Sequence, residues 1–330
     1  MTEKVINMTK LEQIRRPIEE ELNGCRDYMQ GCMVADDAFV QSMLDYIIEN
    51  TGKAVRPSLV LLASKLHSVE KMGERSFLAA MLVEMIHTAS LVHDDVIDES
   101  DMRRGKPSVN SRWGANSAVL CGDFILATAF EKGVMSEQYD IVRYVINALK
   151  ELCSGELVQS ECSRRHNMTR EVYYEIIYKK TAVLLATSAG AGALAVGADK
   201  QLVDNMFRYG RALGMAFQIK DDLLDYDTDA KTGKPSLNDL KEGKITLPLL
   251  CVFEKDATLR ERCISLLEEG SEESLAEVRQ IVVEHGGLTA AAEEMDAFVA
   301  EARQIVASYP ASEVRTALEV MCDFVASRNN

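Results

Sequence analysis

The sequence predicts an all-α protein, and three observations support that prediction. Apolar residues recur at steps of three and four along most of the chain, as on the buried face of a helix. The 330 residues include only six prolines, so long stretches lack the residue that most strongly interrupts helices. No sustained alternation of apolar and polar residues, the pattern of a half-buried strand, is present.

Two of the helical runs lead directly into acidic residues. The first run consists of Leu78, Met81, Leu82, Met85, Ile86, Ala89 and Ser90. The second consists of Phe207, Gly210, Leu213, Gly214 and Phe217. Residues 266–284 are rich in acids and predict solvated surface helices, while loops are expected at 106–108, 227–238 and 285–287. No Pro/Ser-rich linker divides the chain, so we predict a single large helical bundle, one domain over residues 1–330.

Composition excludes several classes of protein. The net charge of -15 argues against binding to nucleic acid, which requires a basic surface. The eight cysteines show no paired CxxC spacing, which predicts a reduced, cytoplasmic chain. The first ten residues lack the apolar core of a signal peptide. Residues 181–198 are uncharged but dominated by Ala, Gly, Ser and Thr, so we expect a packed central helix and no transmembrane segment.

Two aspartate clusters, Asp94-Asp95-Val96-Ile97-Asp98 and Asp221-Asp222-Leu223-Leu224-Asp225, end these runs. On a helix, the first and last acids of each cluster lie one turn apart, separated by about 6 Å along the axis. Like charges at that spacing destabilise the helix, but a divalent cation reverses the effect. Magnesium prefers oxygen ligands and typically takes one or two carboxylates together with substrate phosphates. Two such clusters facing each other would grip a diphosphate through bridging metal ions.

A solvated acidic patch is the simpler interpretation of a single cluster of this kind. Two copies, each following an amphipathic run and each followed by basic residues, favour a metal site instead. The basic positions are Arg103-Arg104, Lys53 with Arg56, Lys179-Lys180, Lys234 and Lys244. Each alone is more simply a surface charge, but together they provide the cations to hold two diphosphates.

Other phosphate-binding and metal-binding motifs are missing from the sequence. No Gly-Lys pair matches GxxxxGK[ST], and no GxGxxG follows a predicted strand. His93 precedes the first cluster, but the other histidines (67, 87, 166 and 285) make no ligand set for a His-Asp metal phosphohydrolase. We therefore interpret His93 as structural.

With these motifs in place, the sequence resembles the all-trans polyprenyl diphosphate synthases. Residues 94–105, DDVIDESDMRRG, resemble the family's first aspartate-rich motif, and residues 217–225, FQIKDDLLD, resemble its second. Gly52-Lys53 with Arg56-Pro57, Gly122-Asp123, Lys180-Thr181-Ala182 and residues 243–248, GKITLP, follow in the family's order. The similarity covers roughly residues 15–325 and is greatest to long-chain members such as octaprenyl diphosphate synthases.

The resemblance implies the isoprenoid synthase type I fold, a helical bundle around a central cavity. It implies a prenyltransferase that condenses isopentenyl diphosphate with an allylic prenyl diphosphate and releases diphosphate. It also implies Mg²⁺, up to three ions per site, and a homodimer. Asp94, Asp98 and Asp221 would be the main metal ligands, with Asp95, Asp222 and Asp225 in supporting positions.

The remaining site residues are also assigned from the resemblance. Isopentenyl diphosphate would be held by Lys53, Arg56, His87 and Arg104. The allylic diphosphate would be held by Arg103, Lys180, Lys234 and Lys244. Thr181 and Gln218 would contact the developing allylic cation, and the departed diphosphate would remove the proton.

Product length is expected to depend on the helix before Asp94. Its side chains lean toward the helix N-terminus and would line a tunnel leading away from the metal ions. In relatives that stop early, a bulky aromatic residue stands four or five positions before this aspartate. Here those positions are small, so we predict a product longer than twenty carbons, with the tunnel lined by Ala89, Ser90, Ile86, Met85 and Leu82. Small residues that merely allow close helix packing are the alternative interpretation.

Three alternatives to a long-chain synthase stay open. One is a shorter-chain farnesyl or geranylgeranyl diphosphate synthase. Another is a regulatory subunit of a heteromeric synthase, although such subunits tend to lose acids from one cluster and this chain retains both. A class I terpene cyclase is disfavoured because the second cluster is a second DDxxD and the isopentenyl-binding residues are present. The exact chain length, the preferred primer, the downstream pathway and the oligomeric state are not determined by the sequence.

Overall fold

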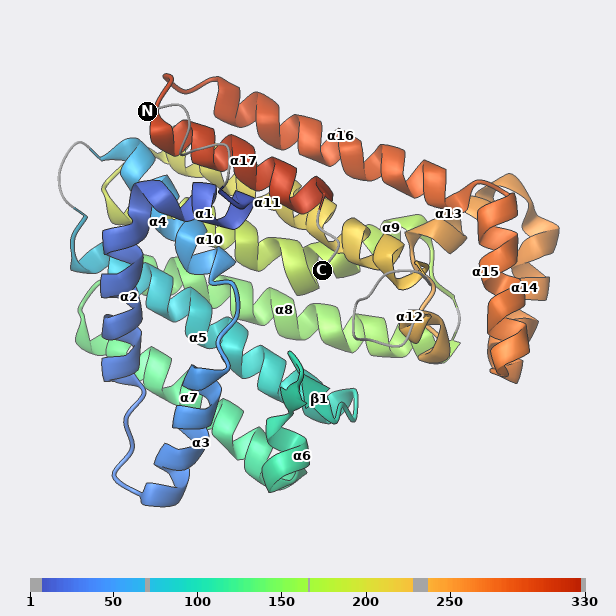
Figure 1. Ribbon diagram of the computed structural model, residues 1–330, viewed down its shortest axis with the longest axis horizontal. Coiled ribbons are helices and arrows are strands. Elements are labelled where there is room, and N and C mark those ends of the chain that lie inside the picture. Colours follow the sequence, from blue (N-terminus) through green and yellow to red (C-terminus); the bar gives the residue numbers. More distant parts are fainter. Residues whose placement is uncertain (1–7, 69–71, 166, 228–236, 328–330) are drawn as a thin grey trace. The chain divides into compact units, whose positions relative to one another are not determined.

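The computed structural model describes residues 8–68, 72–165, 167–227 and 237–327 and consists almost entirely of helices (Figure 1). Within these residues, strands are limited to β1 (Met102–Arg103) and β2 (Lys106–Pro107), which pair in antiparallel fashion. The prediction of an all-α protein is confirmed. The hairpin was not predicted, because strands of two residues are too short to leave an alternating pattern in a sequence.

Contacts group the chain into two compact units, each assembled from separate segments. Unit 1 contains residues 1–149, 187–207 and 310–320, and unit 2 contains residues 150–186, 208–309 and 321–330. Most boundaries fall inside helices, namely α8 (Tyr139–Arg165), α10 (Val183–Ala195), α11 (Lys200–Asp225) and α17 (Glu313–Ser327). The single domain over residues 1–330 stays a prediction.

Unit 1 is built around helix α5 (Glu74–Ile97), which packs against α4 (Val55–His67) and α7 (Ala115–Met135) (Figure 1). The apolar residues at 82, 85 and 86 are fully buried, as their helical spacing predicts. The other elements that lie wholly in this unit are α1 (Lys10–Arg15), the 3₁₀-helix η1 (Arg16–Ile18), α2 (Glu19–Cys32), α3 (Ala38–Glu49), the β1–β2 hairpin and α6 (Val109–Trp113).

Unit 2 contains the pairs α13 (Leu247–Lys255) with α16 (Gly287–Ala307) and α14 (Ala257–Glu269) with α15 (Glu272–Glu284) (Figure 1). The expected surface helices at 266–284 correspond to the end of α14 and to α15, and the expected turn at 285–287 separates α15 from α16. The unit also contains α9 (Arg170–Ile177), the π-helix η2 (Tyr178–Ala182) and α12 (Asn238–Lys241). Most of the expected loop at 227–238 lies outside the described residues.

Two glycines bring helix α11 into contact with η2 and α10. A Cβ added at Gly214 would lie 2.4 Å from the Cα of Ala182, and one at Gly210 would lie 2.4 Å from the carbonyl oxygen of Leu185. Any side chain at either position would collide with backbone. The two glycines lie one turn apart on α11, so they form the contact face that holds residue 181 close to residue 218.

Helix α5 is also the one described helix that is long and apolar enough to cross a membrane. An 18-residue window within it has a hydropathy of 1.3, and 67% of that window is buried inside the protein. The core helix of a soluble protein has the same properties. Residues 183–195, which belong to the uncharged stretch 181–198 that the sequence predicted to be a packed helix, form helix α10.

Candidate active site

The first acidic cluster lies at the C-terminal end of α5. Asp94 is in the last turn, and the amide of Asp98 at the C-cap donates to the Asp94 carbonyl at 2.8 Å. The two side chains therefore stand one turn apart as predicted, with Asp94 half-buried and Asp98 exposed. Acidic groups at a helix C-terminus oppose the helix dipole, so this arrangement does not stabilise the fold. A cation bound here would offset both the repulsion and the dipole.

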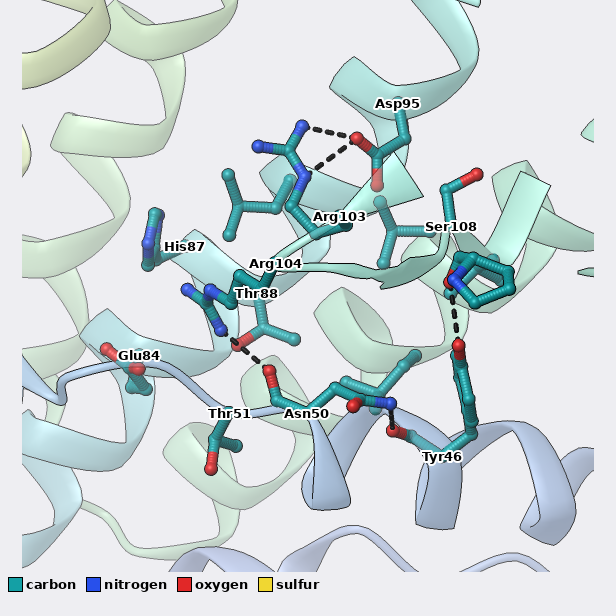
Figure 2. A pocket seen from close by; sticks show the side chains of 15 residues that line it. Tyr46, Asn50, Thr51, Glu84, His87, Thr88, Asp95, Arg103, Arg104 and Ser108 are labelled. Atoms are coloured by element: carbon teal, nitrogen blue, oxygen red, sulfur yellow. Dashed lines mark hydrogen bonds and ion pairs between the residues drawn. The ribbon is translucent and has the colours of Figure 1, made fainter. Parts of the chain in front are cut away.

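Asp95 points into the protein, with only 2% of its surface exposed. Its Oδ1 accepts hydrogen bonds from Nε of Arg103, at 2.8 Å, and from Nη2 of the same guanidinium (Figure 2). The sequence assigned Asp95 to metal support and Arg103 to the allylic diphosphate. The structure brings these two side chains together, and their ligand roles stay predictions.

A pocket with about 60 Å³ of free volume lies beside this ion pair. Its lining includes Asp95, Arg103 and Arg104 together with Glu84 and His87 of α5 (Figure 2). Other lining residues come from the end of α3 and from the start of α6, and of these Tyr46, Asn50 and Thr51 were not anticipated from the sequence. Four predicted ligand residues, Asp95, Arg103, Arg104 and His87, therefore meet at this pocket of unit 1.

Arg104 is held in the pocket by an unusual backbone and by Gly52. Arg104 and Gly105 both have positive φ, 53° and 76°, as a two-residue type I′ hairpin turn requires. Only glycine adopts such angles without strain, so the turn at Arg104 stores strain. The guanidinium donates from Nη1 to the carbonyl oxygen of Asn50 at 2.8 Å (Figure 2). A Cβ at position 52 would lie 2.5 Å from Nη2 of this guanidinium, so Gly52 provides the space that Arg104 occupies.

The charges around this pocket favour an anionic ligand. Burial lowers the pKa of Arg56 to about 10, and Glu84 opposes that shift, so the guanidinium stays charged at neutral pH. Burial and the nearby arginines hold the pKa of His87 well below its usual 6.5, so this imidazole is neutral. Glu84, 7% exposed, is the carboxylate opposing Arg56 and Arg104. These four groups leave one excess positive charge if Glu84 is ionised, and two if it is protonated.

Arg56 has a hydrogen-bond donor without a partner, which also favours an anionic ligand. Its Nε is buried and has no hydrogen-bond partner among the described residues. A buried donor without a partner is costly, and an arriving oxyanion would satisfy it. Glu84 itself was missed from the sequence. The signal was available, because an acidic residue stands in the middle of a buried apolar helical run.

The second acidic cluster ends α11 in unit 2, and its middle acid is also turned inward. Asp222 is 2% exposed, and both of its oxygens are hydrogen-bonded. Tyr173 of α9 donates its hydroxyl to Oδ2 at 2.6 Å, and Gln218 donates from Nε2 to Oδ1 at 2.9 Å. Burial and the nearby Asp239 raise the pKa of Asp222, and the two donors oppose that rise.

The outer acids of this cluster are both half-buried. Asp225 accepts hydrogen bonds from the amides of Asn238 and Asp239, at 2.9 and 3.1 Å, so it also fixes the start of α12. Burial and Asp239 raise the pKa of Asp225 to about 6. Carboxyl groups whose ionisation is disfavoured by crowding are typical of functional sites, and a divalent cation would relieve the repulsion.

The predicted residues Thr181 and Gln218 are in direct contact. The Thr181 hydroxyl donates to Oε1 of Gln218 at 2.6 Å, while the amide of Gln218 donates to Asp222. Thr181 belongs to η2, and π-helical turns inside helices are rare and frequently lie at functional sites. Because its one hydrogen is committed to Gln218, the hydroxyl presents only acceptor lone pairs to any ligand.

The predicted lysines lie in separate surroundings. Lys180 is ion-paired with Glu156 at 2.6 Å, and Lys244 is ion-paired with Glu242. Lys53 is exposed, and its carbonyl oxygen accepts a hydrogen bond from Arg15. Lys234 lies outside the described residues. The ligand roles of these lysines stay predictions.

The residues predicted to control product length lie on α5, and their role in lining a tunnel stays a prediction. Leu82, Met85, Ile86 and Ala89 are fully buried on α5, and the Ser90 hydroxyl donates to the carbonyl oxygen of His87 at 2.9 Å. Small side chains at 89 and 90 therefore face the interior of unit 1 or its edge, and no aromatic residue occupies those two positions.

The donor chemistry of both clusters fits magnesium that arrives with a phosphorylated ligand. Among the described residues, no group of three or more His, Cys, Asp or Glu side chains is arranged to hold a metal ion. Magnesium rarely uses an all-protein cage and keeps positions for water and substrate phosphates. Asp94, Asp98 and Asp221 are hard oxygen donors that would provide the one or two carboxylates needed.

Comparison with known proteins agrees with this description. The Polyprenyl synthetase family matches residues 37–284. A short chain isoprenyl diphosphate synthase from Methanothermobacter thermautotrophicus is 36% identical, over 87% of this chain and 89% of that protein. The octaprenyl diphosphate synthase of Haemophilus influenzae is 32% identical, over 98% of each chain. A solved polyprenyl synthase from Caulobacter crescentus superposes with a TM-score of 0.88, at 34% identity, over 97% of this chain and 98% of that one. The chain therefore belongs to the polyprenyl synthetase family and is a trans-prenyltransferase with the all-α isoprenoid synthase fold.

Proposed function

We propose that this chain condenses isopentenyl diphosphate with an allylic prenyl diphosphate to make an all-trans polyprenyl diphosphate longer than twenty carbons. One observation carries the assignment of the isopentenyl diphosphate site. Arg104, neutral His87 and buried Glu84 line the pocket in unit 1 beside the Arg103–Asp95 ion pair. Arg56, which interacts electrostatically with Glu84 and Arg104, adds the excess positive charge and an unpartnered donor. That set suits a diphosphate better than a carboxylate or a neutral ligand.

The allylic diphosphate is the ligand assigned to the metal ions. When bound, Mg²⁺ would stabilise the negative charge on the leaving diphosphate. Asp94, Asp98 and Asp221 would hold the ions, and Arg103, Lys180, Lys234 and Lys244 would neutralise the remaining phosphate oxygens. The solved Caulobacter crescentus relative was complexed with calcium and isoprenyl diphosphate, which supports a divalent cation and a diphosphate at the family's site.

Thr181 and Gln218 are suited to face the developing allylic cation. The Thr181 hydroxyl donates its hydrogen to Gln218, so its lone pairs are free to point toward positive charge. The two side chains hold each other in place, and the close packing at Gly214 keeps their helices together. This arrangement is preorganised and needs little reorientation when charge develops.

The named relatives include both short-chain and octaprenyl synthases, so the length of the product rests on residues 89 and 90. With Ala89 and Ser90 at the predicted positions, α5 carries no aromatic side chain there that would block a growing prenyl chain. A shorter product, of fifteen or twenty carbons, is the alternative that product analysis would reveal.

A homodimer in the cytoplasm is part of the proposal. Helix α7 exposes several large apolar side chains, including Leu120, 68% exposed, and Met135, 75% exposed. A second copy packed along this helix would cover these exposed apolar side chains. Size-exclusion chromatography with light scattering tests this assembly.

The decisive experiment incubates the purified chain alone with Mg²⁺, an allylic primer and labelled isopentenyl diphosphate, and separates the products by chain length. Products beyond twenty carbons support the proposal. Products that stop at fifteen or twenty carbons identify a shorter-chain synthase. No elongation by the chain alone, with activity restored by a second protein, identifies a regulatory subunit.

A further inference from the structure

Asp222, in the second acidic cluster, is held by two donors from different helices. Tyr173 reaches it from α9, across 49 residues of sequence, and Gln218 reaches it from the preceding turn of α11. Both Tyr173 and Asp222 are almost fully buried, at 3% and 2% exposure. A carboxylate with one donor on each oxygen cannot rotate without breaking a hydrogen bond.

We propose that Tyr173 is a positioning residue, which fixes the carboxylate of Asp222 and through it the last turn of α11 that presents Asp221 and Asp225. This proposal rests on the proposed function, since it assigns a supporting role at the same metal site. The phenol donates to Oδ2 of Asp222 at 2.6 Å, as the ionised, metal-binding form of this acid requires. Partners of this kind around a metal ligand typically change metal affinity or activity tenfold to hundredfold when they are removed.

The geometry distinguishes this role from ordinary packing. A phenylalanine at position 173 would fill the same space, so packing alone needs no hydroxyl. The hydroxyl is aimed at an acid of the cluster, and the adjacent Gln218 is itself oriented by Thr181 at 2.6 Å. Tyr173, Asp222, Gln218 and Thr181 thus form one continuous chain of hydrogen bonds within unit 2.

The neighbouring tyrosine provides a matched control. Tyr174, also on α9, donates its hydroxyl to a carboxylate as well, but to Glu294 of α16, outside the aspartate cluster. Tyr173→Phe and Tyr174→Phe therefore each delete one phenol-to-carboxylate hydrogen bond from the same helix. If losing this kind of hydrogen bond affects only the stability of the fold, the two variants should bind the metal with the same affinity.

The test measures metal binding without turnover. The thermal unfolding midpoint is recorded with inorganic pyrophosphate and increasing Mn²⁺, and the apparent Kd for the metal is obtained from the shift. We expect Y173F to raise this Kd about tenfold or more, and Y174F to stay within about twofold of the unaltered protein. The Mg²⁺ dependence of product formation should shift in parallel for Y173F.

Two results would overturn the proposal. One is an equal metal Kd for Y173F and Y174F in a protein that elongates prenyl chains. The other is additivity in a double-mutant cycle, since a residue acting through Asp222 should add little once Asp222→Asn is present. If Y173F does not fold, the test rests on D222N. An unchanged metal Kd for D222N would then contradict the proposal, because Asp222 is the residue through which Tyr173 is proposed to act. Failure of the unaltered protein to elongate any primer is a separate result and counts against the proposed function instead.

Discussion

The guanidinium of Arg104 occupies the space that a side chain at Gly52 would fill. Its Nη2 lies 2.5 Å from the position of a Cβ on residue 52, while Nη1 donates to the carbonyl of Asn50. Glycine at position 52 thus leaves room for an arginine that is 52 residues away in sequence, and a side chain there would have to displace the end of that arginine. This contact accounts for the glycine of the Gly-Lys dipeptide without a phosphate-binding loop.

Gly52→Ala should displace Arg104 and weaken binding of isopentenyl diphosphate. Losing a charge-assisted contact costs about 1.5–3 kcal/mol, so we expect KM for this substrate to rise about tenfold to hundredfold. Steady-state kinetics at saturating allylic substrate measure the effect. Gly31→Ala in α2 is the matched control, because a Cβ there meets nothing within 4 Å. An unchanged KM in G52A would show that Arg104 does not bind this substrate.

His87 should make the protein less stable as the pH falls. Burial and the nearby arginines hold its pKa well below the 6.5 of the unfolded chain, so the unfolded state binds the proton more readily. Stability linked to this residue is present above pH 6.5 and is lost as the pH decreases. Relative to His87→Gln, the free energy of unfolding should therefore fall as the pH is lowered from 7 to 5.5. Urea unfolding at the two pH values measures this difference, and parallel pH profiles for the two proteins would contradict it.

A bulky residue at position 89 or 90 should shorten the product. Ala89→Phe places a ring in a fully buried site and should lower stability by about 1–3 kcal/mol, whereas Ser90 is half-buried and should tolerate Phe better. Chromatography of the products should show chains of twenty carbons or fewer, with turnover retained. Ser90→Ala is the control and should keep the long product. Equal product lengths for S90F and S90A would show that this helix face does not limit elongation.

Both acidic clusters should be needed for the metal-dependent step. Asp94→Asn and Asp221→Asn should each lower kcat/KM about hundredfold or more, since a metal ion contributes several kcal/mol to stabilising charge. If the clusters converge on one diphosphate, the double variant should lose much less than the product of the two single losses. Chelation of Mg²⁺ should abolish activity, and adding Mg²⁺ back should restore the activity. Fully additive losses would indicate two independent sites.

Much of this molecule is predictable because helical periodicity reports burial directly. The run from Leu78 to Ile86 predicted a core helix, and α5 is buried where the pattern says. The spacing of Asp94 and Asp98 likewise placed two carboxylates one turn apart. These features depend on residues that are near each other in sequence.

The inward-facing acids could not be predicted, because their partners are distant in sequence or hidden by the pattern. Nothing near Asp222 indicates that Tyr173, 49 residues earlier, donates to it. Asp95 was expected in a supporting position at the metal site, and the sequence did not reveal that the hairpin turn at Arg104 and Gly105 folds Arg103 back onto it. Glu84 is the exception, because a single acid within the buried apolar run of α5 was a signal that the sequence did offer.

The π-helical turn at Tyr178–Ala182 has a consequence for how this chain tolerates insertions and deletions. Removing one residue there would let the stretch relax into regular α-helix while α9 and α10 remained intact. A π-turn holds one residue more than the α-helical turn that would replace it, so α9 and α10 would keep their orientations. Only the side chains inside the turn, Lys180 and Thr181 among them, would point in new directions, with the hydrophobic core barely altered. A single-codon deletion at this turn is thus a route to a chain that folds normally but has lost its chemistry.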